Sequence, residues 1–168
     1  NQPITAAPNR WNVSSVKKMS RMFRDARDFN QPIEWDGADG TVIVENMDEM
    51  FNNADAFNST VDLNTAEVKN MNWMFNSANV FNQPVDFNTA KVTSMRAMFA
   101  LTNNFNSAIN FSNTSNVGSM RAMFYKAKVF NQPVNFDTSN VTDFRNMFDE
   151  AQDFNQDVNT REVGGVTL

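Results

Sequence analysis

The chain has 168 residues, of which 20% are charged and 41% are apolar, and its formal net charge is −5. This composition is too apolar for a disordered chain, and no apolar run reaches the roughly 18 residues that a membrane span needs. The acidic balance argues against nucleic-acid binding, which needs clustered Lys and Arg. Because the chain contains no His and no Cys, disulfides, thiolate metal sites and His-dependent catalytic triads are excluded.

A Met-Phe dipeptide recurs six times, and the gaps between its Phe residues are 28, 24, 24, 25 and 24 residues. A second Phe, followed by Asn, lies six residues after the first Phe of each repeat. The dipeptides are Met22-Phe23, Met50-Phe51, Met74-Phe75, Met98-Phe99, Met123-Phe124 and Met147-Phe148. Self-similarity at this period predicts one stack of about six coils of roughly 24 residues. We expect residues 1–168 to form this single domain, as a fragment or subunit of a longer array.

Each repeat has two halves with different periodicity. In the first half, Phe81, Val85 and Phe87 follow the alternation of a short strand. In the second half, the apolar positions from Val92 to Phe105 follow a helical spacing, and Thr89 precedes them as a potential cap. The sequence therefore predicts an α/β solenoid of the leucine-rich-repeat type. Each coil would contain a short strand and a short helix or helical turn.

Three columns of side chains are expected to run through the stack. The Phe and Met residues should form one buried core, because no coil can bury them alone. The Asn that follows the second Phe of every repeat predicts a ladder of side-chain amides at a turn, which we favour over contacts with glycans or ice. Basic residues in the first repeat, such as Arg21 and Arg24, face acidic ones in the second, such as Glu45 and Glu49. We expect these charges to pair between coils as a solvated device that fixes register.

The consensus of the repeat resembles a known family. It reads F-N-Q-P-V-x-F-N-T-x-x-V-x-x-M-x-x-M-F-x-x-A, and the segments from Trp11 to Val16 and from Phe136 to Thr142 follow it closely. This pattern resembles the BspA-like branch of the leucine-rich repeats and covers essentially the whole chain. The resemblance implies a cell-surface or extracellular protein used in adhesion or surface display. It carries over no catalytic residues.

Departures from the repeat mark candidate interface residues. Trp73 occupies a polar position of its repeat, so it is either an interface residue or a side chain packed over a neighbouring coil. Leu101 and Tyr125 are predicted on the same outer side and would extend that patch. An insertion follows Trp35 and contains Asp36, Asp39 and Val42. It predicts either a protruding binding loop, with calcium on the two Asp residues as a weaker alternative, or a tolerated surface insertion.

The two ends of the stack form the other candidate interface. Ile4 and Trp11 of the first coil are expected to meet Val163 and Val166 of a neighbouring copy, if copies stack end to end. We therefore expect a non-catalytic surface or extracellular module for protein recognition or adhesion. The alternative is a structural subunit that assembles end to end into a filament or surface layer. Neither hypothesis involves a cofactor, a metal, nucleic acid or direct membrane insertion, and the partner is another protein or the chain itself.

Overall fold

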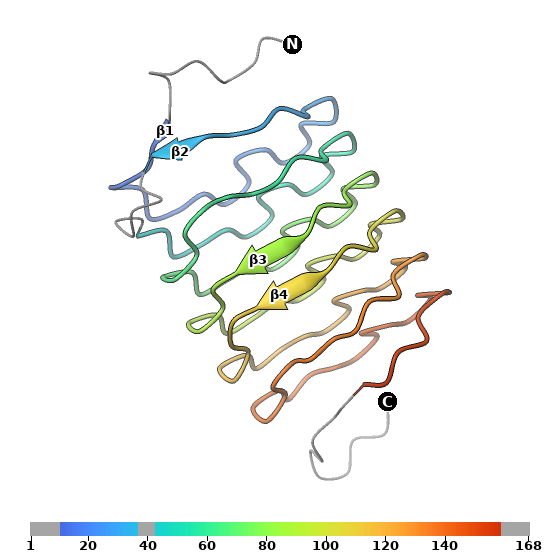
Figure 1. Ribbon diagram of the computed structural model, residues 1–168. Helices are drawn as coiled ribbons and strands as arrows, with labels where there is room; N and C mark the ends of the chain where they lie inside the picture. Colours follow the sequence, from blue (N-terminus) through green and yellow to red (C-terminus); the bar gives the residue numbers. More distant parts are fainter. Residues whose placement is uncertain (1–10, 37–42, 159–168) are drawn as a thin grey trace.

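The computed structural model describes residues 11–36 and 43–158 (Figure 1). The chain winds through successive coils that stack on one another, from the blue coil at one end of Figure 1 to the red coil at the other. We number these coils 1 to 6 by their Met-Phe pairs, from Met22-Phe23 to Met147-Phe148. The first and last described coils therefore lie at opposite ends of the stack.

Neighbouring coils pair as short parallel strands. The strand β1 (Trp11–Asn12) pairs with β2 (Trp35–Asp36), and β3 (Val85–Phe87) pairs with β4 (Ile109–Phe111). On the opposite side of the coils, isolated parallel bridges join equivalent positions in all six coils. They link Lys18, Asn46, Asn70, Ser94, Ser119 and Asp143 in that order. The bridges thus hold each coil in register with the next, and the strand pairs reinforce two of the junctions.

The predicted helices do not form in residues 11–36 and 43–158, so no helix there is long and apolar enough to cross a membrane. The segment that begins at Met95 shows what replaces them. The N–H groups of Met98 and Ala100 donate to carbonyls three residues earlier, whereas those of Ala97 and Phe99 donate to carbonyls of the next coil. Ala97 and Leu101 have positive φ angles of 51° and 61°. Such left-handed residues at the third position close four-residue turns and interrupt a right-handed helix.

The spacing between coils gives the physical reason. Equivalent Phe rings of neighbouring coils are 5.3–6.4 Å apart, as in Phe75 and Phe99 at 5.6 Å. An α-helix with its side chains is about 10 Å wide, so helices cannot stack at this distance. The predicted α/β fold class is therefore wrong. The predicted Thr89 cap is also wrong, because the Thr89 hydroxyl donates to the carbonyl of Asn113 in the next coil. The hydroxyls of Thr65 and Thr114 donate in the same way, at 3.1 and 3.0 Å.

The predicted Phe and Met core is confirmed. Two Phe residues of each coil stack face to face, with centroids 3.9–4.5 Å apart, and both continue into the neighbouring coils. The central members, such as Phe75 and Phe99, are fully buried, whereas Phe148 of coil 6 is only partly buried. All these rings belong to one continuous cluster with the buried Met side chains.

The predicted Asn ladder is also confirmed. The Oδ1 atom of each Asn accepts the backbone N–H of the equivalent Asn in the next coil, as in Asn106 and Asn131 at 2.9 Å. The same acceptor receives a second hydrogen bond from Gln132 Nε2 at 3.1 Å. Five such N–H bonds connect Asn30, Asn58, Asn82, Asn106, Asn131 and Asn155. This column therefore satisfies backbone donors at a turn where the chain has no strand partner.

Replacement of Phe99 by Ala should lower the free energy of unfolding by about 3–5 kcal/mol, because the ring is fully buried between two neighbouring coils. Phe148→Ala is the matched control, and its half-buried ring should cost only about 2 kcal/mol. Urea denaturation followed by circular dichroism measures both. Equal losses for the two variants would contradict the assignment of the core to the middle of the stack.

Replacement of Asn106 by Ala should cost about 1 kcal/mol, because the N–H of Asn131 and the amide of Gln132 lose their acceptor. Hydrogen exchange at the Asn131 amide should become about fivefold faster. Asn104→Ala, an exposed Asn outside the ladder, should leave both quantities unchanged. An unaltered exchange rate at Asn131 in the Asn106 variant would show that the ladder does not protect this turn.

Candidate functional site

One face of the stack is built from the Met-to-Ala turn segments, and we call it the turn face. It comprises residues 19–26, 47–54, 71–78, 95–102, 120–127 and 144–151. Twelve residues with positive φ lie on it, two from each coil. The N–H of each of the ten in coils 1 to 5 donates to a carbonyl of the next coil, as Trp73 does to Arg96 at 2.8 Å. Because these backbone donors are satisfied, recognition on this face depends on side chains.

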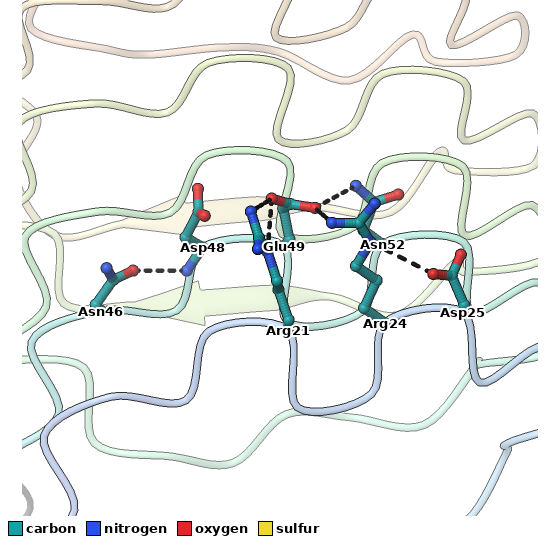
Figure 2. A network of polar contacts seen from close by, with 7 residues as sticks. All are labelled: Arg21, Arg24, Asp25, Asn46, Asp48, Glu49 and Asn52. Carbon is teal, nitrogen blue, oxygen red and sulfur yellow. Dashed lines mark hydrogen bonds and ion pairs between the residues drawn. The ribbon is translucent and has the colours of Figure 1, made fainter.

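In coils 1 and 2 the turn face carries an ion network (Figure 2). Glu49 accepts hydrogen bonds from Arg21 Nε and Nη2, at 3.0 and 2.8 Å, and forms an ion pair with Arg24. The amide of Asn52 reaches its second oxygen at 3.5 Å. The side chain of Glu49 is only 11% exposed. The predicted pairing of charges between coils is thus confirmed here, but the acidic partner is buried rather than solvated.

The surroundings of this network perturb two other carboxyl groups. Burial, and next the neighbouring Glu49 carboxylate, raise the pKa of Asp48 above its usual value. The hydrogen bond from Lys69, with Nζ and Oε2 2.7 Å apart, lowers the pKa of Glu45. Both effects come from contacts within the stack.

In coils 3 to 6 the same column of the turn face opens into a groove. The position of Glu49 is taken by Trp73 in coil 3, by Ala97 in coil 4 and by Ala122 in coil 5. The small side chains leave a depression of about 240 Å³, with the buried Ala100 at its base and Tyr125 lining it from coil 5. A groove of this volume, lined by two aromatic rings, is able to hold a small or extended ligand.

The groove is positively charged. Arg96 and Arg121 line it from neighbouring coils, and neither forms an ion pair with any residue of the described ranges. The guanidinium of Arg96 lies over the Trp73 ring, 4.9 Å from its centroid. The next member of this column, Arg145, is neutralised by Asp143 through two contacts of 2.9 Å. This hydrogen bonding lowers the pKa of Asp143 to about 2.

The charged side chain of Lys126 lies beside Tyr125, the second aromatic residue of the groove. The Nζ atom of Lys126 is 5.0 Å from the centroid of the Tyr125 ring and 3.3 Å from Glu150 Oε1. Hydrogen bonding to the Tyr125 hydroxyl, and next to Glu150, raises the pKa of Lys126. Lys126 therefore stays protonated, and its charge is shared with a carboxylate of the next coil.

The structure brings together two of the predicted interface residues. Trp73 and Tyr125 line the same groove, two coils apart. Leu101 lies on the same turn face and its N–H donates to the carbonyl of Tyr125 at 2.7 Å, but its half-buried side chain is not part of the groove lining. Trp11 lies in the first described coil, 37% exposed, with its ring centroid 6.3 Å from that of Phe23.

The remaining predicted interface residues are not brought to this groove. Asp36 lies in β2, where its backbone pairs with that of Asn12 in β1. Ile4, Asp39, Val42, Val163 and Val166 lie outside the described residues. The calcium site at Asp36 and Asp39 and the end-to-end contact therefore stay predictions. Within residues 11–36 and 43–158, no three His, Cys, Asp or Glu side chains are grouped so that they could hold a metal ion.

Sequence reasoning missed the residues that make the groove. The position of Ala97 and Ala122 carries Arg21 in coil 1 and Glu49 in coil 2. The position of Ala100 carries Arg24 in coil 1 and Asn52 in coil 2. A run of small residues in a column that is otherwise large was the available signal. The signal for Arg96 and Arg121 was the recurrence of Arg at one position of three successive repeats, which Arg145 completes.

A second depression, of about 360 Å³, lies on the strand face near β3 and β4. The exposed side chains of Asp86, Asn110 and Asn135 line it, together with the half-buried rings of Phe111 and Phe136. These three polar residues occupy one outward-facing position of successive coils. The lining contains no cation and no Trp or Tyr, so we regard the turn-face groove as the stronger candidate.

Three overlapping segments of the chain, residues 1–88, 38–109 and 85–167, match a family described as "Mycoplasma protein of unknown function, DUF285". No curated protein and no solved structure matches the chain. The three matches together span nearly the whole sequence, and their overlap reflects the repeat that the stacked coils display. The chain therefore belongs to the DUF285 family of repeat proteins.

Proposed function

We propose that this protein is a non-catalytic recognition module of a cell surface or extracellular layer, used for adhesion or for binding a partner. Its membership of a Mycoplasma repeat family supports this role, as does the resemblance of its repeat to BspA-like surface repeats. The repeat architecture extends a continuous outer surface from coil to coil. Function then resides in the side chains that individual coils place on that surface.

The groove at Trp73 and Tyr125 is the observation that carries the proposal. Small Ala side chains leave space there beside two aromatic rings. Two Arg residues line that space and form no ion pair with the described residues. Interfaces draw most of their binding energy from a few Trp, Tyr and Arg side chains around a hollow. The rest of the turn face contains self-neutralised charges, such as the network around Glu49.

The proposal is tested by replacing Trp73 or Tyr125 with Ala and measuring binding to intact cells. Either change should weaken binding at least about 30-fold, because loss of an interface hot spot costs 2 kcal/mol or more. Ala occupies the position of Trp73 in the next two coils, so Trp73→Ala should fold normally. Flow cytometry of the fluorescently tagged protein on cultured epithelial cells measures the apparent affinity.

Val80→Ala is the matched control, because Val80 is 40% exposed and lies outside the groove lining. This variant should bind cells as the parent protein does. Failure of the parent protein to bind cells saturably would overturn the proposed function. Equal binding by all three variants would show that the groove is not the recognition site.

A further inference from the structure

We propose that the turn-face groove binds acidic carbohydrate, a glycan that carries carboxylate or sulfate groups on successive sugars. This inference rests on the proposed function and specifies the ligand of the same site. Three properties of the groove support it: its uncompensated charge, the placement of its aromatic rings, and the kind of hydrogen-bonding groups that remain free.

The charge of the groove selects an anion. The chain as a whole is acidic, at −5, yet Arg96 and Arg121 face the groove without an ionic partner in the described part of the chain. In coil 2 the same face provides Glu49, which neutralises two Arg residues. In coils 4 and 5 that position is Ala, and neither guanidinium forms an ion pair with a described residue. Asp143 attracts Arg121, but its carboxylate is hydrogen-bonded to Arg145. Planar guanidinium groups bind carboxylate and sulfate in the same bidentate manner.

The spacing of the charges selects a repeating ligand. Arg96 and Arg121 occupy equivalent positions in adjacent coils, and adjacent parallel chains lie about 4.8 Å apart. The two Arg residues therefore follow one another along the axis of the stack. A polymer with an anionic group on each successive unit is able to contact both.

The aromatic rings suit a sugar. Trp73 lines the groove from coil 3 and Tyr125 lines it from coil 5, on either side of the coil that contributes Arg96. The cation over Trp73 and the one near Tyr125 help to fix the two rings in place. The apolar C–H faces of sugar rings pack well on such flat surfaces, while their edges remain available for hydrogen bonds.

The free hydrogen-bonding groups favour a glycan over a peptide. A peptide that adds to a strand needs unpaired backbone groups, but the N–H groups of Trp73, Ala97 and Ala122 all donate to the next coil. What remains is a set of side-chain donors. The Nδ2 atom of Asn76 and the amide of Asn146 line the groove with no hydrogen-bond partner among the described residues. Amides of this kind match the hydroxyl groups of a carbohydrate.

The experiment uses isothermal titration calorimetry of the purified chain with four hexamers. They are a heparin hexasaccharide, which carries sulfate and carboxylate, a hexagalacturonate, which carries one carboxylate on every sugar and no sulfate, neutral chitohexaose, and hexaglutamate. We expect binding of one or both acidic glycans at least tenfold tighter than binding of chitohexaose or hexaglutamate. Binding of heparin alone identifies sulfate as the recognised group, and binding of both at similar affinity identifies carboxylate.

The decisive variant is Ala122→Glu, which adds a negative charge inside the groove. Glu occupies the equivalent position in coil 2 with the same backbone conformation, at φ 55° for Glu49 and 55° for Ala122. The variant should therefore fold, and we expect it to lose at least tenfold in affinity for the acidic glycan. Asn104→Asp adds the same charge at an exposed site outside the groove and should bind as the parent does, since Asp28 and Asp153 occupy that position in other coils.

Arg121→Gln tests the groove independently of whether Ala122→Glu folds. This variant should also weaken glycan binding at least tenfold. Equal binding of the neutral glycan, tighter binding of hexaglutamate, no binding of either acidic glycan, or unchanged affinity in both groove variants would each overturn the proposal. Cell binding that requires Trp73 but survives enzymatic removal of acidic glycans would overturn this inference alone and leave the proposed function standing.

Discussion

The hydrogen bond from one coil to the carbonyl of the next is the interaction on which the rest of this structure depends. On the turn face, every junction between described coils contains four such bonds, for example from Met71, Trp73, Phe75 and Ser77 to coil 4. They fix the distance between coils at the spacing of a parallel sheet. That spacing brings Phe rings into contact and places each side chain directly over its equivalent in the coil below.

These bonds also account for the unusual backbone of the turn face. Twelve non-glycine residues there have positive φ, and each such residue costs roughly 1–2 kcal/mol in an L-amino-acid chain. The conformation persists because the left-handed residue aims its N–H at the neighbouring coil and still closes a turn within its own coil. Local strain is therefore offset by contacts between coils. A single isolated coil would lack this compensation, so the fold is cooperative along the stack.

The sequence alone predicted which residues form the core, but it did not predict the backbone conformation of the turn segments. The period of the Met-Phe pairs identified the Phe stacks and the Asn ladder, because both follow from which residues recur at the same position. The helix prediction failed because positions such as Met95, Met98 and Phe99 have the same spacing in a helix and in consecutive four-residue turns. The deciding quantity is the distance between coils, which the pattern within one coil does not contain.

The candidate site exists because the side chains of the turn face can vary without disturbing its backbone. Since the backbone of the turn face is satisfied by neighbouring coils, its left-handed positions accept side chains as different as Glu49, Trp73, Ala97 and Asn146 without a change of fold. One column therefore forms a buried ion network at one end and a cationic groove further along. Trp73 was recognisable from sequence as the residue that breaks its column. The groove beside it exists because the next two coils carry Ala at the position of Trp73. This small side chain creates a groove only when the coils are stacked, so the sequence of one coil does not reveal it.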